Sequence, residues 1–224
     1  MTETPPAAGS SGVTDLLGVL AYAELTAFWR LAEDAARLAP SLTDRAVLSD
    51  LAATEYGHFR LVRDRLTEMG ADPEEAMAPF VAALDDWHAK TKPGDWLEAL
   101  VKAYVGTGIA QDFYREAARH VDARTSGLVD EVLADEGRSE FAVDRVRGAL
   151  SQDPKRTGRL ALWARRMVGE ALSQGQRVAA ARPDLAALLV GPAGEDLAEI
   201  SRMFARLTEA HGKRMSALGL TPGP

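Results

Sequence analysis

The stretch "TEYGHFRLV" (residues 54–62) decides the fold, because it places costly polar groups on the apolar side of a helix. Glu55 and His58 lie three positions apart, so they share a helical face with Phe59 and Val62. A charged side chain is costly to bury unless it is paired, hydrogen-bonded or bound to a metal. The stretch therefore predicts a polar cluster inside a helical core, with partners supplied by other helices.

The composition limits the kinds of site that the chain can form. The 224 residues include no cysteine, which excludes disulfides, thiolate metal sites and cysteine nucleophiles. A net charge of −7 speaks against a broad nucleic-acid-binding face. No apolar run approaches the ~18 residues of a membrane span, and the first residues do not resemble a signal peptide. We expect a soluble, cytoplasmic protein with no membrane contact.

Apolar residues recur at spacings of three and four along most of the chain, which predicts an all-α fold of long antiparallel helices. We expect residues 1–12, rich in Pro, Gly and Ser, to form a disordered tail, and residues 13–220 to form one domain. The first expected helix runs from residue 13 to just before Pro40, and the second runs from a cap at Ser41 or Thr43 to Gly70. The later expected helices cover about 73–90, 95–121, 125–150, 154–181 and 196–218. A short connecting segment starts at Pro183.

Three further carboxylates continue apolar stripes. Glu24 lies on the stripe that contains Leu20 and Phe28. Asp112 continues the apolar side of the third long helix, and Asp135 does the same in the fourth. Inward carboxylates on successive helices need a common explanation, because each is costly to bury alone.

Equal distances from a turn place two residues of an antiparallel helical hairpin at the same height. The midpoint between Glu24 and Glu55 falls in the turn "LAPS", and the midpoint between Asp112 and Asp135 falls in the turn "DARTSG". Each hairpin is therefore expected to hold its two carboxylates level, and His58 can join them. Carboxylates and imidazole suit iron or manganese, and ferritin-like di-iron bundles are built from such ligands.

The order of several motifs resembles a known family. The sequence is similar to the ferritin-like proteins grouped with the tRNA isopentenyladenosine hydroxylases (MiaE-like), over about residues 13–220. The residues that carry the resemblance are "LLGVLAYAELTAFWRLAEDA", "EYGHFRLVRDRL", "LEALVKAYVGTGIAQDFYREAA", "VLADEGRSEFAV" and "LALWARRMVGEAL". The resemblance implies a ferritin-like antiparallel four-helix bundle with an additional C-terminal helical hairpin.

The resemblance also implies a metal site and a reaction. The implied metal ligands are Glu24, Glu55, His58, Asp112 and Asp135, which would hold two irons per chain, or manganese in their place. The implied reaction is oxidation of a small-molecule substrate by dioxygen, with no catalytic residues beyond the ligands. The acidity of the chain speaks against tRNA itself as the substrate.

One residue departs from the family pattern. Arg138 stands three positions after Asp135, where the family has a second histidine, and arginine cannot act as a metal ligand. Arg138 either tunes a metal from beyond its ligands or replaces one of the two metals by pairing with Asp135. If it replaces the metal, the chain is a metal-free ferritin-like bundle that acts as a binding or interaction module.

Other polar residues are alternatives of lower rank. Glu170 and His211 lie on apolar faces of the last two long helices, and Glu116 follows Asp112 by one turn. His88 and His120 stand beside charged residues, and we expect both to be solvated. The basic stretch from Lys155 to Arg166 is expected to be a solvated face with acidic neighbours. A homodimer is compatible with a bundle of this size, but iron storage ranks last, because nothing in the sequence indicates a hollow oligomer.

Overall fold

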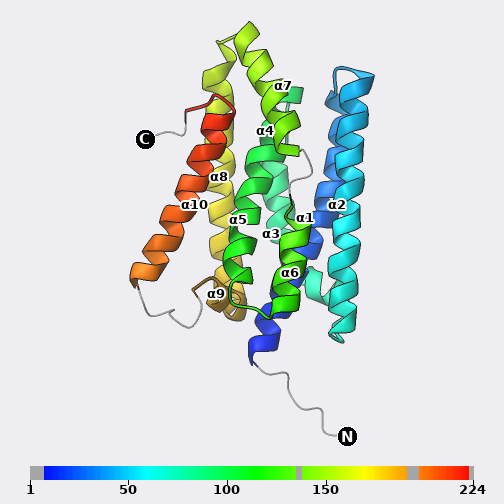
Figure 1. Ribbon diagram of the computed structural model, residues 1–224, viewed down its shortest axis with the longest axis vertical. Coiled ribbons are helices and arrows are strands. Elements are labelled where there is room, and N and C mark those ends of the chain that lie inside the picture. The colour runs from blue at the N-terminus through cyan, green and yellow to red at the C-terminus, as the bar shows by residue number, and fades with distance from the viewer. Residues whose placement is uncertain (1–7, 135–137, 191–196, 222–224) are drawn as a thin grey trace, which may run out of the picture.

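The prediction of an all-α fold is confirmed. The computed structural model describes residues 8–134, 138–190 and 197–221, and within these ranges it contains helices and turns but no strand (Figure 1). No helix in the described ranges is long and apolar enough to cross a membrane.

The first two helices form a long antiparallel pair. Helix α1 spans Ala8–Leu38 and α2 spans Leu42–Glu68, which begins at an N-cap where the Ser41 hydroxyl accepts a hydrogen bond from the Asp44 amide. Helix α1 starts five residues before the expected domain boundary, so the prediction of a disordered tail is wrong for residues 8–12. Gly12 lies in this early part of the helix, where a Cβ would lie 2.7 Å from the Asp184 carbonyl oxygen. The first turns of α1 are thus packed tightly against the segment that follows α8.

The third long helix has three parts. A short helix α3 (Pro73–Lys90) precedes it, and the long helix then runs through α4 (Trp96–Val101), the π-helix η1 (Lys102–Gly106) and α5 (Thr107–Ala118). The extent agrees with the predicted helix 95–121, but the π turn was not expected. At Gly106 a Cβ would lie 2.9 Å from Cη2 of Trp87, so the absent side chain lets α3 approach η1 closely.

The fourth predicted helix, 125–150, is wrong as a single element. Helix α6 spans Ala123–Val132, the chain leaves the helical path at Leu133, and α7 spans Arg138–Gln152. The Leu133 carbonyl accepts a hydrogen bond from Arg115 of α5 at 2.9 Å. Helix α6 therefore ends at a contact with a neighbouring helix, at a point where the apolar pattern of the sequence continues.

The last helices agree closely with the prediction. They are α8 (Arg156–Ala181), α9 (Pro183–Val190) and α10 (Leu197–Ala217). The basic residues between Lys155 and Arg166 are exposed, as expected. Among them, Arg159 binds Asp95 at 2.6 Å and also contacts Glu98.

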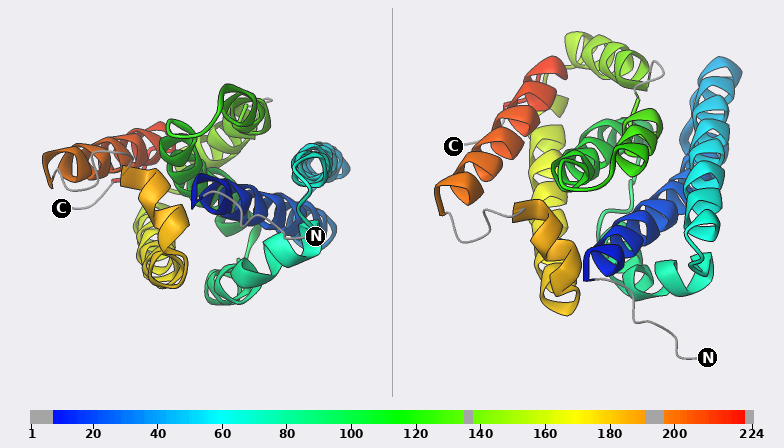
Figure 2. Two further views of the ribbon diagram at one scale, coloured as in Figure 1. Left: turned by 90° about the horizontal axis from the view of Figure 1, so that it is seen from below. Right: turned by 60° about the horizontal axis from the view of Figure 1, so that its bottom comes forward.

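The third long helix lies between two parts of the molecule (Figure 2). On one side are α1, α2 and α6, whose core includes Leu17, Leu20 and Val62. On the other side are α7, α8 and α10, whose core includes Met167 and Met215. Helices α3 and α9 complete the bundle against α1. The third helix is therefore buried on two opposite faces, and a side chain on its apolar stripe has two cores to face.

Candidate metal centre

Two carboxylates and one imidazole meet inside the α1–α2 pair. Glu24 of α1 and Glu55 and His58 of α2 each offer a ligand atom within 4.8 Å of the others. His58 Nδ1 lies 3.4 Å from Glu24 Oε2 and 3.7 Å from Glu55 Oε2. Their exposed fractions are 7%, 2% and 6%, so all three groups are withdrawn from water. The prediction that the first hairpin holds Glu24 and Glu55 level is confirmed.

The local sequence fixes this arrangement. Glu24 follows Leu20 by one helical turn, and Leu20 is fully buried. On α2, Phe59 and Val62 are buried beside Glu55 and His58. The apolar neighbours thus turn the polar groups inward as they pack, and the short connection between α1 and α2 sets their common height.

The electrostatics of the cluster call for a cation. Burial and then the charge of Glu55 raise the pKa of Glu24 well above its ordinary value. The contacts with Glu24 and then Glu55 raise the pKa of His58 to about 9. Two neighbouring carboxylates in a water-poor site cannot both stay ionised without a compensating positive charge. Either a proton on His58 or a bound metal ion can supply that charge.

The donor atoms fit a metal ion of the iron or manganese type. Glu24 Oε2 and His58 Nδ1 are fully buried, and neither makes a hydrogen bond with any described residue. Their separation of 3.4 Å is longer than an ordinary N–H···O bond, which leaves both atoms available to a common cation. Carboxylate oxygen with imidazole nitrogen is the ligand set that suits these metals.

The structure does not bring Asp112 into this cluster. Its carboxylate accepts hydrogen bonds from both terminal nitrogens of Arg214 on α10, one of them at 3.2 Å. Arg115 lies 3.8 Å away on the same helix. The apolar stripe that contains Val101 and Val105 belongs to the core of α7, α8 and α10, so Asp112 continues it toward α10 and not toward α1. The Asp112 side chain points inward as expected, but toward the core of α7, α8 and α10 and not toward that of α1 and α2.

The alternative carboxylate of α5 also faces α10. Glu116 binds Arg206 through two hydrogen bonds of 2.9 and 2.7 Å and contacts Arg119 at 3.2 Å. These arginines hold the pKa of Glu116 below its ordinary value. Glu116 is therefore part of the contact between α5 and α10, outside the cluster.

The remaining sequence candidates lie elsewhere or outside the described ranges. Glu170 is partly exposed on α8, with Lys90 Nζ 3.6 Å away. His211 lies on α10, where burial and then Arg214 lower its pKa. Asp135 lies outside the described residues, and of Arg138 only its place at the start of α7 is described. Neither Glu170 nor His211 belongs to the buried acid–histidine group.

Sequence reasoning missed the side of α5 that does approach the cluster. Thr107, Gln111 and Tyr114 line a cavity together with Glu24 and Glu55. Burial and then the charge of Glu24 raise the pKa of Tyr114. The signal was present, because the three residues are spaced by four and three and form a polar stripe along one side of the helix.

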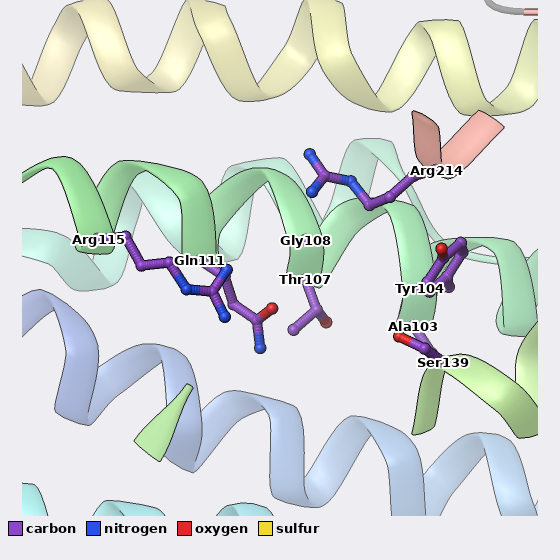
Figure 3. Close-up of a pocket in the computed structure, with 8 residues that line it drawn as sticks. All are labelled: Ala103, Tyr104, Thr107, Gly108, Gln111, Arg115, Ser139 and Arg214. Carbon is purple, nitrogen blue, oxygen red and sulfur yellow. The ribbon is translucent and has the colours of Figure 1, made fainter. Parts of the chain in front are cut away.

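Two hollows flank this stripe. A polar pocket of about 200 Å³ is lined by Thr107, Gln111, Arg115 and Arg214 among others, and Figure 3 shows the first three pointing toward the same side of α5. A larger cavity of about 370 Å³ shares Thr107 and Gln111 but has mainly apolar walls. The acid–histidine cluster thus lies at the wall of an apolar cavity.

Comparisons with known proteins give one family. A family model described as a ferritin-like domain of actinomycetes matches residues 8–192, most of the chain. No curated protein matches the sequence.

Proposed function

The chain belongs to the ferritin-like domain family of actinomycetes, and on that basis we propose that it is an oxygen-dependent oxidoreductase with a metal centre at Glu24, Glu55 and His58. The metal would be iron, with manganese as the second choice. The sequence resemblance to the tRNA isopentenyladenosine hydroxylase-like proteins supports an oxidation as the type of reaction. The acidity of the chain favours a small molecule over tRNA as the substrate.

The observation that carries this proposal is the opening of a buried ligand cluster onto an apolar cavity. Glu24 and Glu55 line the cavity, and the imidazole of His58 completes the cluster. A purely structural ion pair needs no such access to a hollow. A centre that oxidises an apolar substrate needs both the ligands and the hollow.

Each residue has a distinct role in the proposal. When bound, the metal supplies the activation of dioxygen for attack on a C–H bond. Glu24 and Glu55 would balance the charge of the metal, and His58 would be its nitrogen ligand after losing the proton that the two glutamates favour. The apolar walls keep water from the substrate.

A second metal needs ligands from another helix. Asp112 is held by Arg214, so the di-iron form of the proposal depends on Asp135, which lies outside the described residues. The proposed centre therefore holds its first metal more tightly than a second.

The alternative function is a metal-free binding module. The observation that favours it is the position of His58, 3.4 and 3.7 Å from the two glutamates, where a protonated imidazole neutralises part of their charge. The two functions differ in what replaces the buried positive charge, so metal content separates them.

The first experiment measures metal per chain. Protein reconstituted with ferrous iron without oxygen is expected to retain between one and two irons per chain after desalting, as measured by plasma mass spectrometry. Less than about a tenth of an iron per chain would contradict the proposal and favour the binding module.

A matched pair of variants locates the metal. Glu55→Gln keeps the size of the side chain but removes a ligand charge, and we expect Mn²⁺ to bind at least ~100-fold more weakly in calorimetry. Asp112→Asn is the control, because its carboxylate contacts Arg214 and lies outside the cluster. Equal losses of affinity in both variants would place the metal between α2 and α5 and would contradict the three-residue centre.

A further inference from the structure

The polar pocket of about 200 Å³ lies beside the apolar cavity and takes no part in the proposed function. It shares Thr107 and Gln111 with that cavity, but the glutamates of the metal centre do not line it (Figure 3). Among the described residues, two cations line the pocket, Arg115 and Arg214, and no acid does. The pocket therefore suits a different kind of ligand from the apolar cavity.

One of the two cations is already neutralised. Both terminal nitrogens of Arg214 donate hydrogen bonds to the carboxylate of Asp112. Arg115 Nη1 lies 3.8 Å from Asp112 Oδ1, which is longer than a hydrogen bond. Since Arg214 balances the single negative charge of Asp112, the described residues around the pocket leave one positive charge, at Arg115. A ligand that enters the pocket thus meets a cation that favours an anion.

The guanidinium of Arg115 is held in place at the pocket wall. Its Nη2 donates a hydrogen bond to the Leu133 carbonyl at the end of α6, at 2.9 Å. The side chain is about half exposed, so the pocket is open to solvent beside it. A cation that is already fixed loses little conformational entropy when it binds an anion. Arg115 should therefore bind an anion more tightly than an arginine that moves freely at the surface.

Two uncharged side chains add hydrogen-bonding groups beside Arg115. Thr107 carries a hydroxyl and Gln111 a carboxamide, and both point to the same side of α5 as Arg115 (Figure 3). Both are half-buried, and neither forms a hydrogen bond to another residue in the part of the chain that the structure describes. Gln111 and Arg115 are one helical turn apart, a spacing at which two side chains can reach the two oxygens of one carboxylate.

The volume limits the ligand to a small molecule. At about 30 Å³ for each non-hydrogen atom, as in liquid water, the pocket of about 200 Å³ holds roughly six or seven such atoms. A carboxylate group with a short hydrocarbon chain fills this space, and Ala103 and Gly108 offer apolar wall to the chain. Inorganic phosphate is small enough, but at neutral pH it carries more than one negative charge against the single positive charge of the wall.

We propose that the polar pocket binds a short-chain monocarboxylate of roughly six or seven non-hydrogen atoms, with Arg115 Nη1 and the Gln111 amide as donors to its two oxygens. This binding goes beyond the proposed function and requires no metal. Because Thr107 and Gln111 also line the apolar cavity, the bound carboxylate lies next to that cavity on the other flank of the polar stripe.

Two probes of equal size test the role of the charge. Butyrate and butyramide have the same number of non-hydrogen atoms, and only butyrate is an anion. In saturation-transfer NMR titrations of the metal-free full chain, we expect butyrate to bind at least about tenfold more tightly than butyramide. The metal is omitted because a carboxylate would also bind to it. Inorganic phosphate is expected to displace butyrate less effectively than a second short-chain carboxylate, propionate, does.

Variants of α5 locate the bound carboxylate. Arg115→Met removes the cation and keeps a long side chain, so the tenfold preference for butyrate should disappear, whereas Arg115→Lys should keep part of it. Gln111→Leu leaves the bond to the Leu133 carbonyl intact and should weaken butyrate binding about threefold or more. Arg119→Met is the matched control, because Arg119 is exposed on the same helix, contacts Glu116 and lies outside the pocket. Circular dichroism shows whether each variant is folded.

Several results would overturn the inference. They are equal affinity of the wild-type chain for the two probes, a butyrate preference that survives in Arg115→Met, an equal loss in Arg119→Met, and no binding of butyrate at about 10 mM. Stronger displacement by phosphate than by propionate would reject a carboxylate as the ligand. If Arg115→Met does not fold, Gln111→Leu decides, since unchanged butyrate affinity in that variant contradicts the proposed contacts.

Discussion

His88, which was expected to be solvated, is only 9% exposed and holds an uncharged imidazole in the core near Lys102, whose own pKa burial lowers to about 7. Burial, followed by the nearby cations Lys102 and Arg30, lowers the pKa of His88 from 6.5 to about 2. The two acids that precede His88 in the sequence interact with other residues: Asp85 accepts a hydrogen bond from Tyr22, and Asp86 binds Lys90. Protonation of His88 therefore opposes folding.

This burial predicts a specific sensitivity to acid. The pKa of His88 is lower in the folded chain than in the unfolded one, so the stability linked to it is complete above pH 6.5 and is lost as the pH falls toward 2. Between pH 6 and pH 4 the wild type should lose about 2 kcal/mol more free energy of unfolding than His88→Phe. Urea unfolding at the two pH values measures this difference.

The control for the acid experiment is His120→Phe, whose histidine is exposed. This variant should lose stability in parallel with the wild type. If His88→Phe also followed the wild type, His88 would titrate as an ordinary exposed histidine and its burial would be wrong.

At this scale, the sequence predicts a buried polar residue well when its neighbours are on the same or the adjacent helix. Glu24, Glu55 and His58 could be placed together from helical spacing and distance to one turn. His88 could not, because its burial depends on α3 packing against η1, and its sequence neighbours are charged. The side chains that surround it come from residues far away in the chain.

Among the helices, α10 depends on two acid–arginine contacts with α5. Asp112 binds Arg214, and Glu116 binds Arg206. Gly108 leaves the space that Arg214 occupies, since a Cβ at this position would lie 2.6 Å from Cδ of Arg214. The glycine therefore allows the cation to reach the half-buried carboxylate of Asp112.

Gly108→Ala should weaken the docking of α10. The added methyl group displaces the Arg214 side chain and leaves Asp112 without its main partner, for an expected loss of about 1–3 kcal/mol in the free energy of unfolding by urea. Gly169→Ala on α8 is the matched control, because nothing lies within 4 Å of the new Cβ, and it should be neutral or slightly stabilising. Equal stability of the two variants would show that Arg214 contributes nothing to the docking.

The contact between α5 and α10 also explains why Asp112 lies outside the metal site in which the sequence pattern placed it. An apolar stripe predicts that a side chain points inward, and Asp112 does so. It does not tell which core the side chain faces when the helix is covered on two sides. The choice between α1 and α10 depends on the arginines of α10, which follow Asp112 by about a hundred residues in sequence.

Among the described residues, the buried acid–histidine group lies on one helical pair. Glu24 and the pair Glu55 and His58 join α1 to α2, whereas the core of α7, α8 and α10 has separate buried residues. A ligand stabilises most strongly the part of a protein that must open to release it. Metal binding should therefore slow amide hydrogen exchange more in α1 and α2 than in α8 and α10.

Hydrogen exchange can detect this inequality. With Mn²⁺ at about 100 times its dissociation constant, amides of α1 and α2 near the three ligands should exchange up to ~100-fold more slowly. Amides of α8 and α10 that open without α1 should change little. Glu55→Gln should show no such protection. Protection confined to α8 and α10 would contradict the assigned ligands.

At this largest scale, most of the fold could be predicted from helical periodicity and from the positions of proline and glycine. The first hairpin, the third long helix and the C-terminal helices agree with the sequence pattern. The end of α6 at Val132 could not be predicted, because the apolar pattern continues past it and the Leu133 carbonyl meets Arg115 of another helix there. No local signal in "VLADEG" reports a contact made by another helix.

The π-helix η1 has a consequence for the evolution of this family. Its i to i+5 hydrogen bonding holds one residue more than an α-helical turn over the same rise. A relative with an uninterrupted third helix can keep the facing of Thr107, Gln111 and Tyr114 only if it lacks one residue between positions 102 and 106. Without that deletion, the following helix is rotated by about 100°, the angle of one residue. Alignments of relatives therefore need a one-residue gap at η1 before ligand positions on the third helix can be compared.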